Sequence, residues 1–70
     1  MFSKEQQHRK LVQRIREEFE ERPCLRLSVP EASRFWALDE ISCEMVLRDL
    51  QMHGFLAQGV DHRFQMYAPA

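Results

Sequence analysis

Apolar residues recur at helical spacing in the first third of the chain, where no glycine or proline interrupts residues 3–22. One side of the predicted helix is formed by Leu11, Val12, Ile15 and Phe19. This spacing predicts a first helix over residues 3–22 with one face against a core. The helix is expected to end before Pro23, because proline disfavours a helical conformation in the residue that precedes it.

A second, short helix is marked by the clearest start signal in the sequence. Ser28 is followed three residues later by Glu31, which is the spacing of a capping box. Pro30 suits the first turn, where its missing N–H is not needed. The pattern predicts a helix over residues 29–37, in which Trp36 is expected to anchor the core.

A third helix is predicted over residues 40–53, with Asp39 as its N-cap and Gly54 at its end. Its core side is expected to carry Cys43, Val46, Leu47 and Leu50. Two helices joined by so short a turn indicate a helix-turn-helix.

Two runs rich in apolar and aromatic residues follow, residues 55–58 and 63–67, with a turn between them. They predict a β-hairpin over residues 55–67. Residues 24–27 alternate apolar and polar side chains and predict a single strand or an extended connection. The expected fold is one domain over residues 1–70, mainly α with a small β-hairpin (α+β).

In this order of elements the chain resembles the winged helix-turn-helix domains of small bacterial regulators. The resemblance covers residues 11–67 and is carried by the runs Leu27-Ser28-Val29-Pro30-Glu31-Ala32, Phe35-Trp36-Ala37-Leu38-Asp39, Cys43-Glu44 with Val46-Leu47, and Gly54-Phe55-Leu56. It implies a three-helix winged helix-turn-helix. Most domains of this class bind DNA through the third helix and the hairpin, and a substantial minority bind protein.

The resemblance therefore favours a small DNA-binding protein, a transcriptional regulator that reads duplex DNA as a dimer. The candidate DNA contacts are Arg34, Ser42, Arg48, Gln51 and Arg63. The charges oppose this assignment, since residues 29–53 contain two arginines and five acidic residues, a net charge of −3. That is a poor electrostatic match to a phosphate backbone.

The alternative is a winged-helix protein-interaction module. If Cys43, Val46, Leu47 and Leu50 of the third helix face the core, the opposite face of that helix is exposed. This outer face carries Ile41, Met45 and Met52 beside Arg48. Adaptable apolar side chains in that position fit a protein partner or a second copy of the chain. Two further possibilities are that this face is covered by the N-terminal segment with Met1 and Phe2, or that its apolar side chains contact thymine methyl groups in DNA.

Composition and charge bear on the class of protein, but they do not decide between DNA binding and protein binding. The chain has 70 residues, a net charge of −1 and a pI near 6.3, so the whole molecule has no strong attraction to nucleic acid or membrane. No signal peptide or apolar run long enough to cross a bilayer is visible, which favours a cytoplasmic protein. The two cysteines form no CxxC pair, and Cys43 is expected to be a packed thiol.

Catalytic chemistry is not predicted. The three histidines, His8, His53 and His62, lack the spacing of metal ligands, and the only two glycines, Gly54 and Gly59, form no phosphate-binding loop. We therefore expect no enzyme activity, no metal and no cofactor.

Overall fold

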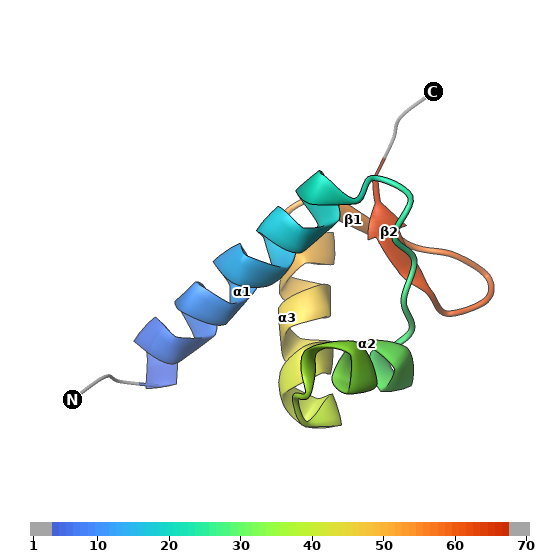
Figure 1. The fold of residues 1–70 in the computed structure, drawn as a ribbon. Coiled ribbons are helices and arrows are strands. Elements are labelled where there is room, and N and C mark those ends of the chain that lie inside the picture. Colours follow the sequence, from blue (N-terminus) through green and yellow to red (C-terminus); the bar gives the residue numbers. More distant parts are fainter. Residues whose placement is uncertain (1–3, 68–70) are drawn as a thin grey trace.

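Three helices and a β-hairpin make up the computed structural model, which describes residues 4–67 (Figure 1). The elements are α1 (Lys4–Glu21), α2 (Val29–Trp36), α3 (Glu40–Met52), β1 (Leu56–Gln58) and β2 (Phe64–Met66). The predicted fold class, mainly α with a small hairpin, is confirmed. Each helix ends within one residue of its predicted boundary, and each strand is shorter than the run that predicted it.

Side chains fix the starts of α2 and α3 as the sequence predicts. The Ser28 hydroxyl accepts a hydrogen bond from the N–H of Glu31 at 3.4 Å, and the Glu31 carboxylate accepts one from the N–H of Ser28 at 3.0 Å. At α3, the Asp39 carboxylate accepts from the N–H of Ser42 at 2.9 Å. Each cap satisfies N–H groups that have no partner inside the helix.

The end of α3 turns the chain toward the hairpin. His53 is the C-cap, and Gly54 follows in a left-handed conformation with φ +78°. The N–H of Gly54 donates to the carbonyl of Gln51, and the N–H of Phe55 to that of Leu50, both at 3.0 Å. These two bonds form a Schellman motif, in which glycine adopts the positive φ without steric cost.

The turn between α2 and α3 is tight. Ala37 ends α2 with φ 54° and ψ 46°, in the left-handed region. The N–H of Leu38 donates to the carbonyl of Ser33 at 3.0 Å, and the Ser33 hydroxyl donates to the carbonyl of Leu38. These bonds hold α2 and α3 as a helix-turn-helix pair.

Replacing Ala37 with glycine should stabilise the protein by about 0.5–1 kcal/mol, because an L-residue with a Cβ is strained at this φ and glycine is not. The urea midpoint should rise with an unchanged m-value. Ala57→Gly in β1 is the matched control and should destabilise the fold, since glycine weakens a strand. An Ala37→Gly variant as unstable as Ala57→Gly would contradict this account of the turn.

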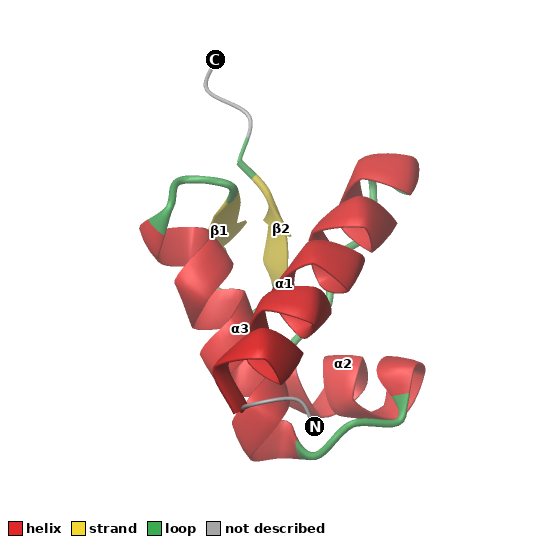
Figure 2. Ribbon diagram, turned by 90° about the vertical axis from the view of Figure 1, so that its left-hand side faces the viewer, coloured by secondary structure: helices red, strands yellow, loops and turns green. Residues whose placement is uncertain are grey.

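The core lies where α1, α3 and the hairpin meet. α1 packs across α3, α2 packs near the start of α3, and the hairpin packs at its end (Figure 2). The buried side chains include Ile15 and Phe19 from α1, Cys43, Val46, Leu47 and Leu50 from α3, Trp36 from α2, and Leu56 and Phe64 from the hairpin. The predicted core face of α3 and the predicted packing of Trp36 and Cys43 are confirmed.

The hairpin is joined to the segment before α2. β1 and β2 pair antiparallel, with Ala57 opposite Gln65. Leu27 forms a single bridge to Phe64, donating to its carbonyl at 3.1 Å and accepting from its N–H at 2.7 Å. Of the run 24–27, therefore, one residue pairs as a strand and the others form an extended connection. No helix in the described part of the chain combines the length and apolar composition that a membrane crossing requires.

Candidate functional site

The outer face of α3 leaves three large apolar side chains in solvent. Ile41 is 73% exposed, Met45 58% and Met52 86%, and all three lie opposite the buried side of the helix. Together with Arg48, which lies between Met45 and Met52, they form what we call the outer stripe. The predicted exposure of this face is confirmed. Met1 and Phe2, which could cover it, lie outside the described residues.

Arg48 is the only cationic side chain of the outer stripe, and an acid on the same helix neutralises it. Its Nε donates to the Glu44 carboxylate at 2.9 Å, one turn earlier in α3. Both side chains are largely exposed, so the pair contributes little stability. Its main effect is to cancel the positive charge that a DNA phosphate would meet.

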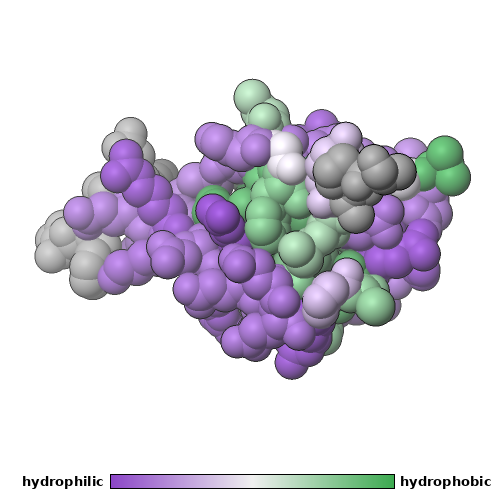
Figure 3. Space-filling model, turned by 90° about the horizontal axis from the view of Figure 1, so that it is seen from above, coloured by the Kyte–Doolittle hydropathy of each residue, from purple (hydrophilic) through white to green (hydrophobic). Residues whose placement is uncertain are grey.

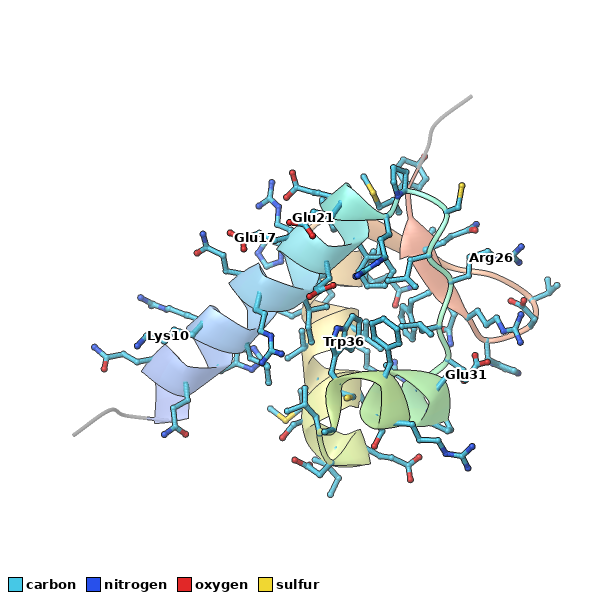
Figure 4. The ribbon with its side chains drawn as sticks, in the orientation of Figure 1. Lys10, Glu17, Glu21, Arg26, Glu31 and Trp36 are labelled. Atoms are coloured by element: carbon cyan, nitrogen blue, oxygen red, sulfur yellow. The ribbon has the colours of Figure 1, made fainter. Side chains whose placement is uncertain are left out.

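Arg63 in the hairpin is neutralised in the same way. Its Nε lies 3.1 Å and its Nη2 3.3 Å from the two carboxylate oxygens of Glu31, the third residue of α2 and the partner of Ser28 in the capping box. Arg26 pairs with Asp61 of the hairpin turn at 3.2 Å. Figure 4 shows Arg26 beside this turn and Glu31 at the start of α2. The arginines near the hairpin therefore fasten it to the body of the protein.

The other candidate DNA contacts are spread over α2 and α3. Arg34 is exposed in the last turn of α2 and has no ion pair with any described residue. Ser42 is half-buried at the start of α3, and Gln51 is exposed near its end. Arg63, by contrast, lies against the first turn of α2. The structure thus does not gather the five candidates into one cationic surface.

Two histidines meet at one carboxylate, which the sequence did not predict. His8 of α1 places its Nε2 3.3 Å from one Asp49 oxygen, and His53 places its Nδ1 3.3 Å from the other. They line an open groove of about 750 Å³ between α1 and α3, in which the Arg16 guanidinium lies 4.9 Å from the centre of the Phe55 ring. The spacing of His53 from Asp49 was visible in the sequence, but His8 is 41 residues from Asp49. Only the crossing of α1 over α3 brings it there.

Metal binding has no support in the described residues. No three or more His, Cys, Asp or Glu side chains among them are placed to hold one ion. Asp49 instead contacts both imidazoles, which connects the N-terminal half of α1 to α3.

Three carboxylates have a lowered pKa because the folded chain stabilises their ionised form. For Glu31 the main cause is the N–H of Ser28, followed by the Ser28 hydroxyl and Arg63. The N–H of Ser42 lowers the pKa of Asp39, and the N–H of Arg63 lowers that of Asp61, with Arg26 adding to it. All three groups are solvent-exposed, so each effect is screened.

These lowered pKa values set the sign of an acid effect on stability. A carboxylate whose pKa is lower in the folded state stabilises the fold above its unfolded pKa, about 4, and loses that contribution as the pH falls through the folded pKa. We expect the free energy of unfolding, measured by urea titration, to be constant above about pH 5 and to decrease below about pH 4. Glu31→Gln with Asp39→Asn should reduce this loss, because glutamine and asparagine still cap helices without titrating. An unchanged acid loss in the double variant would contradict the assignment.

Comparison of the chain with protein-family models, with curated proteins and with solved structures found no match. The resemblance to winged helix-turn-helix regulators therefore stays a prediction.

Proposed function

We propose that the protein is a protein-interaction module of the winged-helix type and that the outer stripe of α3 is its binding surface. The observation that carries the proposal is the exposure of Ile41, Met45 and Met52 on one helix face. Burying a side chain of this size stabilises a complex by about 1.5–3 kcal/mol. Methionine also adapts its shape to a partner more readily than branched residues do.

The charges support the same proposal. Residues 29–53 carry two arginines against five acidic residues. Of the two, Arg48 already pairs with Glu44, and in the hairpin Arg63 pairs with Glu31. A helix that enters the major groove needs free cations and hydrogen-bonding side chains toward the bases. The outer stripe offers mostly methyl and thioether groups instead.

Binding of duplex DNA is the second candidate. It is favoured by the exposure of α3 opposite the core, together with a hairpin at one end of the same helix. Arg34 and Gln51 are exposed and could contact phosphates or base edges. Surface ion pairs contribute about 0–1 kcal/mol, so a phosphate could replace Glu44 at Arg48. On this account the protein would act as a transcriptional regulator.

A titration with labelled mixed-sequence duplex DNA, followed by fluorescence anisotropy at 50 and 200 mM salt, separates the two candidates. We expect no binding up to about 100 μM protein at the lower salt concentration. A dissociation constant above this value is weaker than typical non-specific affinity for DNA. Micromolar binding that weakens about fortyfold at the higher salt, as expected for about three neutralised phosphates, would contradict the proposal.

Two arginine variants test whether any DNA binding seen in this titration uses α3. Arg48→Ala should abolish it if α3 reads DNA. Arg22→Ala is the matched control, because Arg22, immediately after α1, forms the same kind of pair with Glu18 one turn earlier. Equal losses in both variants would indicate attraction by general charge.

A further inference from the structure

The N-terminal half of α1 lies outside the core. None of the side chains of residues 6–14 is buried, and Ile15 is the first residue of α1 that is. Figure 3 shows the hydrophilic surface of this helix extending away from the apolar middle of the molecule. A helical segment this short is marginal in water by itself. Its helical state therefore depends on the contacts that hold it against α3.

A contact between two titratable side chains joins this half of α1 to α3. The Nε2 of His8 lies 3.3 Å from one carboxylate oxygen of Asp49. The two side chains are 34% and 35% exposed, so water screens the contact only in part. His8 also borders a hollow of about 340 Å³ that reaches Met45 of the outer stripe. The contact therefore holds α1 beside the proposed binding surface.

The strength of this contact depends on the charge of the imidazole. A histidine side chain gains its positive charge in the range between about pH 8 and pH 5. A neutral imidazole can only donate a hydrogen bond to Asp49, whereas a protonated one forms a charge-assisted bond that is about twice as strong. We infer that the His8–Asp49 contact is a proton-sensitive switch, in which protonation of His8 holds the N-terminal half of α1 more firmly on α3. This holds whatever the outer stripe binds.

The other charges near His8 cancel and leave Asp49 as the net charge that it meets. Four charged residues of α1 line the groove beside the contact: Arg9, Arg16, Glu17 and Glu20. The chain after α3 contributes only uncharged residues to this groove, and the hollow on α3 that His8 borders has no charged residue besides His8 itself. A protonated His8 is therefore attracted to Asp49 without a second acid competing for it from another element.

His53 contacts the same carboxylate but does not join two elements. Its Nδ1 donates to the backbone carbonyl of Asp49 at 2.7 Å and lies 3.3 Å from the second carboxylate oxygen. His53 is the C-cap of α3, so this contact stays within one helix and its end. It gives a matched control: a histidine at the same carboxylate whose protonation does not act on α1.

The expected effect is local and moderate. An exposed or half-exposed ion pair changes an equilibrium by about two- to fivefold. A change of this size is close to the uncertainty of a urea extrapolation, so the total free energy of unfolding does not resolve it. Amide exchange does, because the amide protons of residues 8–14 exchange when this half of the helix opens.

Amide exchange rates of the full chain, measured by NMR at about pH 5.5 and about pH 8, test the inference. Dividing each variant's rates by those of the wild type at the same pH removes the intrinsic pH dependence of exchange. In His8→Gln we expect residues 8–14 to exchange about two- to fivefold faster than in the wild type at the lower pH, and at nearly the wild-type rate at the higher pH. Asp49→Asn keeps a hydrogen-bond acceptor without the charge and should give the same pattern. His53→Gln should exchange like the wild type at both pH values.

Two results would overturn the inference: a ratio of His8→Gln to wild-type rates that is the same at both pH values, or an equal pH response in His53→Gln. The second result would place the response at the end of α3 and not at α1. Circular dichroism of the three variants should match the wild type, because none of the three side chains is buried. No partner is present in this measurement, so either result leaves the proposed function unchanged.

Discussion

Phe64→Ala should destabilise the protein by about 3–5 kcal/mol. Phe64 is 1% exposed, and truncating a buried phenylalanine costs about 3–5 kcal/mol. A chain of 70 residues has a total stability of roughly 3.5–10 kcal/mol at 0.05–0.15 kcal/mol per residue. A single substitution can therefore remove most of it.

Thermal melts followed by circular dichroism measure this effect. Val60→Ala is the control from the same hairpin, because its side chain is fully exposed and its loss should leave the melting temperature within about 2 °C of wild type. A Phe64→Ala protein that melts close to wild type would mean that the hairpin is not part of the core. The expected result agrees with the backbone bonds between Phe64 and Leu27, which fix β2 to the segment before α2.

Trp36 should respond very differently to two substitutions. Trp36→Ala is expected to cost about 3–5 kcal/mol, because the ring is 7% exposed and packs 6.0 Å from Phe19 and 5.4 Å from Phe35, centre to centre. Trp36→Phe is expected to cost less than about 1 kcal/mol. The indole Nε1 is buried with no hydrogen-bond partner among the described residues, and an unpaired buried donor costs about 1–3 kcal/mol. Phenylalanine removes this donor and so offsets much of the lost packing.

Urea unfolding of the two variants gives the comparison directly, since both change the same site. If Trp36→Phe were as unstable as Trp36→Ala, the indole N–H would have to be satisfied in solution, and the packing of α2 against α1 would need to be revised.

The helix boundaries and the buried side of α3 were predicted correctly because they depend on residues close together in the chain. The capping box of Ser28 and Glu31, the Asp39 cap and Gly54 act within a few residues of themselves, so their spacing reveals the helix boundaries. The periodicity of α3 likewise separates its buried side from its exposed side. These features do not depend on how distant segments meet.

The charges of the candidate site were harder to predict, because their partners are distant in the chain. Arg63 pairs with Glu31, 32 residues away, which the sequence did not indicate. The contact of His8 with Asp49 likewise depends on how α1 crosses α3. The pair of Arg48 with Glu44 is the exception, since its spacing of four residues within a helix was visible in the sequence.

Photo-crosslinking of the purified protein tests the binding role of α3 most directly. A photoreactive phenylalanine derivative would replace Met45, and irradiation at about 200 μM protein would be carried out with and without duplex DNA, beside a control with the same group at Val60. We expect no more protein–DNA adduct from position 45 than from position 60. A protein–DNA adduct that forms at position 45 and not at position 60 would contradict the account and make α3 a DNA-reading helix.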